Sequence, residues 1–195
     1  MNLPGLLVLT DRHQTTRPLV DVVRAAVNGG ARAVVLREKD LPRAVRAHLA
    51  DQIRPILTDA GALLIMASDP TIPADGVHLA AGDQLPANRP LLVGRSCHDP
   101  TGLQAAAEAG CDWATLSPIF PSSSKPGYGP ALGTAALAGA PLPVYALGGV
   151  DAERAAACVA AGAVGVAVMG AVMRATDPAA VVANLLRALD GETGR

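Results

Sequence analysis

The sequence predicts an α/β fold: a single (β/α)8 barrel, or TIM barrel, spanning residues 1–195. Short, nearly continuous apolar runs alternate with alanine-rich helical stretches, as expected for parallel strands that are buried on both faces. Half of the residues are hydrophobic and only 2% are aromatic, so small aliphatic side chains must fill the core. Eight repeats of the strand–helix unit favour a closed barrel over an open, doubly wound sheet.

Eight apolar runs are predicted to form the strands. Each is bounded by glycine, proline or charged residues, and each is rich in valine, leucine, isoleucine or alanine. The predicted strands cover residues 6–10, 33–36, 63–66, 76–79, 91–94, 113–116, 144–147 and 165–169.

Helices are predicted between most of these strands. Pro18 and Gly29 mark the start and end of the first helix, and Asp151 and Gly162 mark those of a later one. Pro55 is expected to kink or split the second helix. The predicted helices cover residues 18–28, 41–60, 100–109, 131–137, 151–161 and 177–189. The connections after the third and fourth strands are too short for ordinary helices, which predicts shortened helices there.

Composition excludes several classes of function. The formal net charge is −1, so no global basic field attracts nucleic acid or anionic lipid. The three cysteines, Cys97, Cys111 and Cys158, lack metal-type spacing. No signal peptide and no apolar run of about 20 residues is found, so we expect a cytoplasmic protein without a membrane or nucleic-acid partner.

The ends of the strands carry the candidate site, because catalytic residues of such barrels lie at the carboxyl-terminal rim. Arg37 and Lys39 stand two residues apart at the end of the second strand, which places both on one side of the chain. Two cations so placed favour a bound anion. A solvated turn in which Glu38 and Asp40 are the partners is an equally good interpretation.

Residues 121–129 form the longest predicted loop. Ser122, Ser123, Ser124 and Lys125 can wrap a phosphate with hydroxyl and ammonium donors. Loops of this length in a short chain are often functional, although such composition is also typical of a flexible surface loop.

Gly148, Gly149 and Gly170 follow the last two strands, where these barrels usually bind phosphate. Glycines let backbone amides approach an oxyanion closely, although they also serve as simple turn residues. The final predicted helix starts too late to reach the ligand, so the amides near Gly149 and Gly170 are expected to bind it.

Histidines provide the candidate acid/base. His98 follows the fifth strand at the rim, where its side chain can exchange protons near neutral pH. A lone histidine is also a common structural residue, and His78, within the fourth strand, is interpreted that way. Cys97 is a weak candidate nucleophile, because adjacent strand residues face opposite sides.

Five motifs in the right order resemble one family, thiamine phosphate synthase and its sister enzyme, the thiazole tautomerase. The motifs span nearly the whole chain. They are Leu36-Arg37-Glu38-Lys39-Asp40, Ala74-Asp75-Gly76-Val77-His78-Leu79, Ser117-Pro118-Ile119-Phe120-Pro121 running into Lys125, Ala146-Leu147-Gly148-Gly149-Val150 and Gly165-Val166-Ala167-Val168-Met169.

The departures from the family pattern bear on the reaction. The synthase joins a hydroxymethylpyrimidine pyrophosphate to a thiazole phosphate with the help of magnesium. Val35 stands in place of its glutamine, and Met66 and Ala67 in place of its Asn-Asp pair, whose aspartate helps to hold the metal. Asp83 corresponds to the second metal carboxylate, and one carboxylate makes a poor magnesium site. Gly170 stands where the synthase usually has serine.

The resemblance therefore favours the tautomerase, which aromatises a thiazole carboxylate phosphate by moving a proton and needs no metal or redox cofactor. It implies that His98 is the catalytic acid/base, that Arg37 and Lys39 hold the carboxylate or phosphate, and that the protein is a homodimer. The alternatives are a divergent magnesium-dependent synthase, with Asp83 as a metal ligand, and a non-catalytic phosphate-binding regulator. The predicted substrate-binding residues are Arg37, Lys39, Ser96, Ser122, Ser124, Lys125, Gly148, Gly149, Met169 and Gly170.

Overall fold

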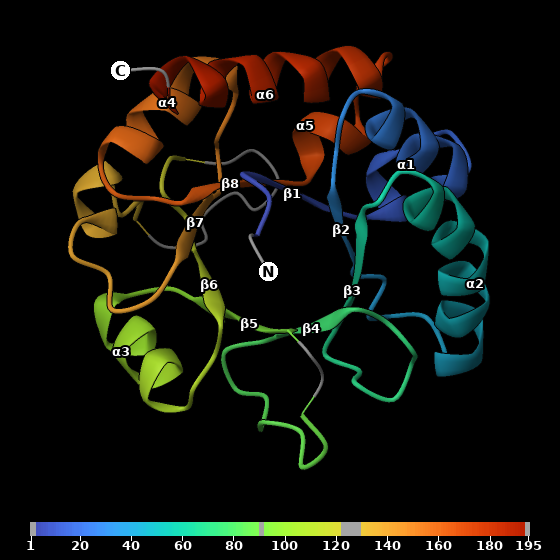
Figure 1. The fold of residues 1–195 in the computed structure, drawn as a ribbon, viewed down its shortest axis with the longest axis horizontal. Helices are drawn as coiled ribbons and strands as arrows, with labels where there is room; N and C mark the ends of the chain where they lie inside the picture. The colour runs from blue at the N-terminus through green and yellow to red at the C-terminus, as the bar shows by residue number, and fades with distance from the viewer. Residues whose placement is uncertain (1–2, 90–91, 122–129, 194–195) are drawn as a thin grey trace.

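The computed structural model describes residues 3–89, 92–121 and 130–193 and confirms the predicted barrel. Eight parallel strands, each paired with its neighbours in chain order, close on themselves because β1 pairs with both β2 and β8. Figure 1 looks along the barrel, with the outer helices arranged around the strands. An open, doubly wound sheet is thereby excluded.

The strands are short and almost fully buried. Most agree with the predicted runs within a residue or two, but β5 extends further, so that Arg95 and Ser96 belong to the strand. The strands are β1 (Leu6–Leu9), β2 (Ala33–Leu36), β3 (Leu63–Ala67), β4 (Gly76–Leu79), β5 (Leu92–Cys97), β6 (Trp113–Leu116), β7 (Val144–Leu147) and β8 (Gly165–Val168).

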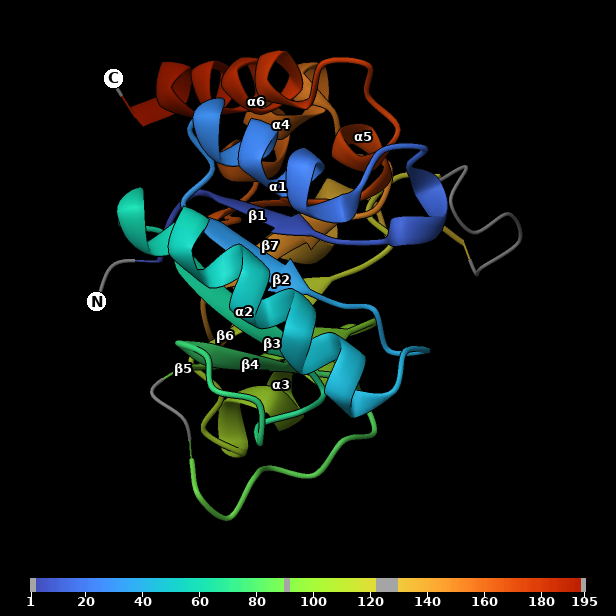
Figure 2. The same cartoon turned by 90° about the vertical axis from the view of Figure 1, so that its right-hand side faces the viewer.

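The helices pack on the outside of the strands, where α1 and α2 lie side by side (Figure 2). Among the described residues, no helix combines the length and apolarity that crossing a membrane requires. The helices are α1 (Leu19–Asn28), α2 (Arg43–Asp59), α3 (Pro100–Glu108), α4 (Ala152–Ala160), α5 (Gly170–Met173) and α6 (Pro178–Thr193), with 3-10 turns η1 (Arg12–Gln14) and η2 (Thr134–Leu137).

Three helix predictions need correction. The helix α2 continues through Pro55 without splitting, because Ile53, Ile56 and Leu57 bury both halves against the barrel. The helix predicted over 131–137 is only the 3-10 turn η2, which begins after Gly133 in a left-handed conformation. The short helix α5 was not predicted, and it starts directly after β8.

A fourth correction concerns the connections after β3 and β4, which are shorter than the others, as the sequence predicts, but do not contain the predicted shortened helices in their described residues. Residues 68–75 and 80–89 contain no helix in the part of the chain that the structure describes. In Figure 1 the ring of helices is accordingly interrupted beside β4 and β5.

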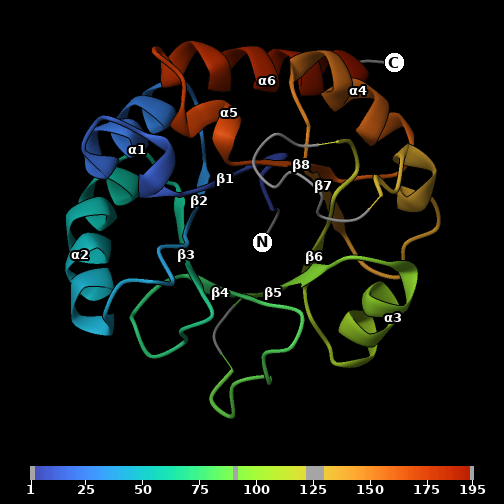
Figure 3. The same ribbon diagram turned by 180° about the vertical axis from the view of Figure 1, so that it is seen from behind.

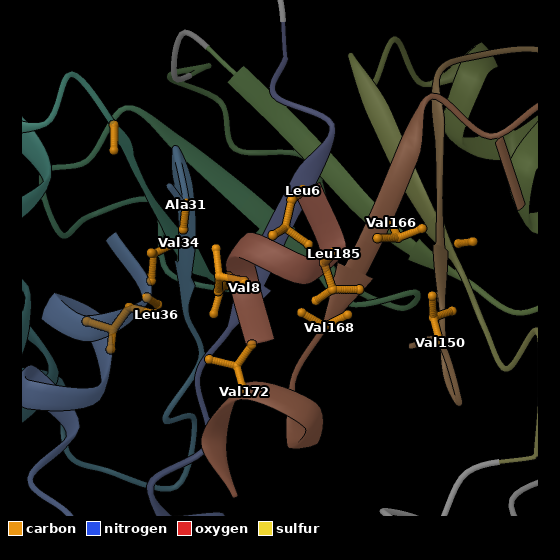
Figure 4. Packing of buried hydrophobic residues seen from close by; sticks show 14 of the residues in the cluster. Leu6, Val8, Ala31, Val34, Leu36, Val150, Val166, Val168, Val172 and Leu185 are labelled. Carbon is orange, nitrogen blue, oxygen red and sulfur yellow. The ribbon is translucent and has the colours of Figure 1, made fainter. Parts of the chain in front are cut away.

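Side chains alternate between the inner and the outer side of the barrel wall along the strands. Leu7, Val35, Ile65 and Ala67 belong to a cluster inside the barrel, whereas Met66 belongs to the cluster beneath the helices. Figure 4 shows part of this outer cluster, where Val172 of α5 and Leu185 of α6 lie near Val8 and Val168. Whether a residue stands at an odd or an even position of its strand therefore decides whether its side chain can reach a site inside the rim.

The amino-terminal half of the interior is filled by Trp113 and Tyr145, which meet edge to face at 5.7 Å. Gly94 makes room for this packing, because a Cβ there would lie 2.5 Å from Trp113 Cδ2. We predict that Gly94→Ala lowers the free energy of unfolding by about 2 kcal/mol, since overpacking a filled core costs this much. Urea denaturation measures the loss, and an unchanged midpoint would contradict the packing account.

Candidate functional site

A cavity of about 830 Å³ opens at the carboxyl ends of the strands. Its floor is formed by the last inward-facing residues of the strands, and its walls by the turns that follow them. Arg37, Lys39, Ser96, His98, Gly148, Gly149, Met169 and Gly170, all predicted to bind or react, line it. Ser122, Ser124 and Lys125 lie outside the described residues.

Arg37 and Lys39 both face the cavity, as their spacing predicts. The carboxylates of Glu38, which lies between these two cations, and of Asp40, which follows them, both bind Arg12. Arg12 donates to Glu38 at 3.1 Å and to Asp40 at 2.7 Å. The pKa of the Asp40 carboxyl is held well below its usual range, chiefly by its hydrogen bond with Arg12 and then by that with His13. Both carboxylates therefore have Arg12 as a partner.

His98 lies at the end of β5 with its ring fixed by β6. Its Nδ1 atom is 2.9 Å from the backbone carbonyl oxygen of Ser117 and 3.3 Å from the Ser117 hydroxyl. A carbonyl oxygen only accepts hydrogen bonds, so Nδ1 carries the hydrogen in the neutral ring, and Nε2 then carries the lone pair. This tautomer suits a general base at the rim.

His78 is buried, as the structural interpretation requires, but it also forms part of the cavity floor. Its ring stacks on Trp113 at 4.7 Å, and its Nε2 atom is 3.0 Å from the Ser96 hydroxyl. Burial, followed by the positive charge of Lys39, lowers the pKa of His78 to about 3. The ring is therefore neutral at physiological pH.

This shift predicts a pH dependence of stability. Folded His78 stays neutral down to its pKa of about 3, whereas the unfolded chain takes up the proton near 6.5. Between these values the unfolded state binds more protons, so stability falls as the pH drops through this window. From pH 7 to pH 5 the loss from this group is about 2 kcal/mol.

We expect His78→Phe, which keeps an aromatic ring on Trp113, to lose this part of the pH dependence in urea denaturation at pH 7 and pH 5. His48→Phe is the matched control, because His48 is exposed on α2. An equal slope in wild type and His78→Phe would contradict the buried neutral ring.

Gly148 and Gly149 adopt left-handed conformations with φ of 93° and 65°. A Cβ at Gly148 would lie 2.9 Å from Pro118 Cα, and one at Gly149 would lie 2.5 Å from the Pro121 carbonyl oxygen. The turn after β7 is thus pressed against the segment after β6, and only glycine fits at both positions. The result is bare backbone along this wall of the cavity.

Two arginines that sequence reasoning missed line the same side. Arg154 of α4 donates to the Gly149 carbonyl oxygen at 2.7 Å and lies over the Phe120 ring at 5.0 Å. Arg174 follows α5 and donates to Gln14. Both come from helices rather than from strand ends, so a search confined to the strand ends does not find them. Figure 3 shows α5 lying between β8 and the outer helices.

On the opposite side, beside β2 and β3, the floor of the cavity is apolar, and Arg37 and Lys39 are the charged residues at the rim. Val35 and Ala67 line the cavity there. Met66 packs beneath the helices instead, so only Ala67 of the Met66–Ala67 pair faces the site. Asp69 does not replace the missing carboxylate, because it forms ion pairs with Arg43 at 4.0 Å and Arg46 at 3.9 Å on α2.

Asp83 does not provide a magnesium site by itself. Its carboxylate accepts hydrogen bonds from the Ser68 hydroxyl and from the Ala80 amide, the latter at 2.7 Å. Burial raises its pKa, but these hydrogen bonds and nearby cations outweigh burial and leave the pKa below its usual value. Within the described ranges, no three metal-ligating side chains converge. Asp83 would therefore have to hold a magnesium ion without the second carboxylate of the synthase pattern.

Cys97 faces away from the cavity. Its side chain is buried in the outer cluster, and burial raises the pKa of the thiol to about 11. Its neighbours Ser96 and His98 face the cavity, which is the alternation expected along a strand. The structure gives Cys97 no nucleophilic position at the site.

Together, the closed barrel and the cationic cavity at its rim define a (β/α)8-barrel protein of the type that binds phosphorylated small molecules. A family model described as thiamine monophosphate synthase matches residues 6–172. The chain belongs to this family.

Relatives and solved structures agree with this assignment. A putative thiamine-phosphate synthase of Geobacter sulfurreducens is 38% identical, with 97% of this chain and 96% of the relative covered. The thiamine-phosphate synthase of Methanoculleus marisnigri is 41% identical over 92% of each chain. A structure of thiamine phosphate pyrophosphorylase from Pyrococcus furiosus superposes with a TM-score of 0.85 at 27% identity, covering 97% of each chain.

Proposed function

We propose that this protein is a thiazole tautomerase of thiamine biosynthesis, an isomerase that aromatises a thiazole carboxylate phosphate by proton transfer. The observation that carries the proposal is the division of the cavity into two unlike sides. Beside β2 and β3 the cavity floor is apolar, at Val35 and Ala67, and Arg37 and Lys39 are the charged residues at the rim. Beside β7 and β8, Gly148 and Gly149 combine with further basic residues. Such a cavity suits one phosphorylated thiazole better than a second substrate that carries a pyrophosphate and magnesium.

The described lining residues match the charges of this substrate. Arg37, Lys39, Arg154 and Arg174 are basic, and Asp151 is the only acidic residue among them. Arg37 and Lys39 are proposed to bind the carboxylate, while the turns after β7 and β8 bind the phosphate. Ser96 and Met169 border the ring, and Ser122, Ser124 and Lys125 remain predicted phosphate donors.

His98 is proposed to move the proton. Its Nε2 atom takes the proton from the ring carbon that bears the carboxylate and returns it to the exocyclic carbon. The Ser117 carbonyl oxygen, 2.9 Å from Nδ1, orients the ring and stabilises the imidazolium formed in between. A proton leaves and returns with no change of oxidation state, so the step requires no redox cofactor, and the proposed proton transfer by His98 includes no metal. The expected protein is a cytoplasmic homodimer.

A second candidate, a divergent magnesium-dependent thiamine phosphate synthase, is favoured by the names of the relatives. The proteins of Roseiflexus castenholzii and Methanoculleus marisnigri are named thiamine-phosphate synthase, at 36% and 41% identity. That activity is a transferase reaction, and Asp83 would then be a metal ligand. The apolar residues Val35 and Ala67 and the hydrogen-bonded state of Asp83 argue against it.

Two assays on the purified protein separate the candidates. Aromatisation is followed by chromatography of the thiazole product, and synthase activity by magnesium-dependent formation of thiamine phosphate from both precursors. The proposal predicts aromatisation well above the buffer rate and no thiamine phosphate. Thiamine phosphate without aromatisation would establish the synthase, and ligand binding with neither reaction would indicate a regulatory protein.

A further inference from the structure

The guanidinium group of Arg174 lies in the space that a side chain at position 170 would fill. Gly170 is buried and lines the cavity directly after β8. A Cβ built on Gly170 would lie 2.7 Å from both Cζ and Nη2 of Arg174. Arg174 itself is exposed and also lines the cavity. The absence of a side chain at 170 thus lets a cation reach the rim beside β8.

The position of Arg174 is held by neighbours on η1. Its Nη1 atom donates to the Gln14 amide oxygen, and the Gln14 amide nitrogen donates to Asp11 at 2.7 Å. Its own backbone nitrogen donates to the Gly170 carbonyl oxygen at 3.1 Å. One donor of the guanidinium is therefore used to orient it. The other donors remain for hydrogen bonds to a ligand, since a guanidinium has five N–H groups.

We infer that Arg174 is a phosphate-binding residue of this site, and that Gly170 is required to admit its guanidinium. A planar guanidinium can donate two parallel hydrogen bonds to two oxygens of a phosphate, a geometry that neither a hydroxyl nor an ammonium group offers. This inference rests on the proposed function in one respect: the proposed function identifies the phosphate ester as the thiazole phosphate. It assigns Arg174 to the phosphate rather than to the carboxylate, because Arg37 and Lys39 extend from β2 instead.

Calorimetric titration with the thiazole phosphate and with its dephosphorylated alcohol tests the inference. Arg174→Ala is expected to weaken binding of the phosphate ester at least about tenfold and to leave binding of the alcohol unchanged. Arg174→Lys restores only part of the affinity, because it cannot bind two oxygens in a plane. Arg187→Ala is the matched control for the loss of one exposed positive charge, and it should bind as wild type does.

The variant Gly170→Ala tests the inference independently. Gly170 does not have a positive φ, so alanine fits the backbone, but its methyl group displaces the guanidinium. Gly170→Ala should therefore weaken phosphate binding like Arg174→Ala, and the double variant should be no weaker than either single one. Additive losses would show that Gly170 acts separately from Arg174.

The possible results distinguish failure of this inference from failure of the proposed function. Equal affinities of wild type and Arg174→Ala for the phosphate ester, with aromatisation intact, would overturn the role of Arg174 alone. Equal losses for ester and alcohol, or a wild type that binds neither, would also overturn it. If Arg174→Ala weakens binding of the ester but not of the alcohol, and the wild-type protein shows no aromatisation, the inference is supported and the proposed function is refuted.

Discussion

Replacing His98 with alanine is expected to lower the rate of aromatisation at saturating substrate by about 100- to 10,000-fold, the contribution typical of general acid/base catalysis. The Nδ1 atom of His98 lies 2.9 Å from the Ser117 carbonyl oxygen, which fixes the ring at the rim. The other ring nitrogen, Nε2, is the atom proposed to exchange the proton. No other group is proposed to carry the proton between the two carbon atoms. Stopped-flow measurement of the absorbance change on aromatisation gives the rate.

Binding separates loss of catalysis from loss of structure. The His98→Ala variant should bind the thiazole phosphate within a few-fold of wild type, because the phosphate is proposed to bind at the turns after β7 and β8. His48→Ala, an exposed histidine variant on α2, serves as the control with an unchanged rate. A His98→Ala protein that aromatises the substrate as fast as wild type would remove His98 from the mechanism.

Gly149→Ala is expected to weaken binding of the thiazole phosphate by tenfold or more. The φ of 65° is strained for alanine, and the new Cβ would lie 2.5 Å from the Pro121 carbonyl oxygen and 2.8 Å from Phe120 Cβ. Strain of this kind costs about 1–3 kcal/mol. Because the obstacle is backbone, the turn itself must move, and its amides leave the position from which they contact the phosphate. Titration calorimetry measures the affinity.

Gly61→Ala is the control for backbone strain alone. Gly61 has a φ of 62°, close to that of Gly149, but no atom lies within 4 Å of its Cβ position. It follows α2 at the opposite end of the barrel from the cavity, so the affinity for the thiazole phosphate should not change. If both variants bind the ligand as wild type does, the turn after β7 is not part of the phosphate site.

The barrel could be predicted because its strands are buried on both faces. Runs such as Val34-Val35-Leu36 are apolar throughout, and helix caps such as Asp151 and Gly162 punctuate them. Two of the errors, at α5 and η2, occur where a segment is too short to show periodicity. The four-residue helix α5 has no amphipathic pattern of its own, and η2 has only a single turn, so local sequence does not separate either from a loop.

The site residues that directly follow a strand could be predicted from the sequence. Arg37, His98 and Gly149 are found by asking which residues follow an apolar run. The role of Gly170 is not found this way, because its consequence depends on where the guanidinium of Arg174 lies in space. Likewise, only strand parity in the closed barrel shows that Ala67 faces the cavity and Met66 does not.

We expect this rim to bind one phosphorylated thiazole rather than two substrates bridged by magnesium. Titration of the protein with each synthase precursor, with and without Mg²⁺, tests it most directly. We expect the thiazole phosphate to bind equally well in both conditions. We expect the pyrimidine pyrophosphate not to bind in either, because Val35 and Ala67 offer its pyrimidine ring no polar partner, which the charges of Arg37 and Lys39 do not replace. Tight, magnesium-dependent binding of the pyrimidine pyrophosphate would contradict the account.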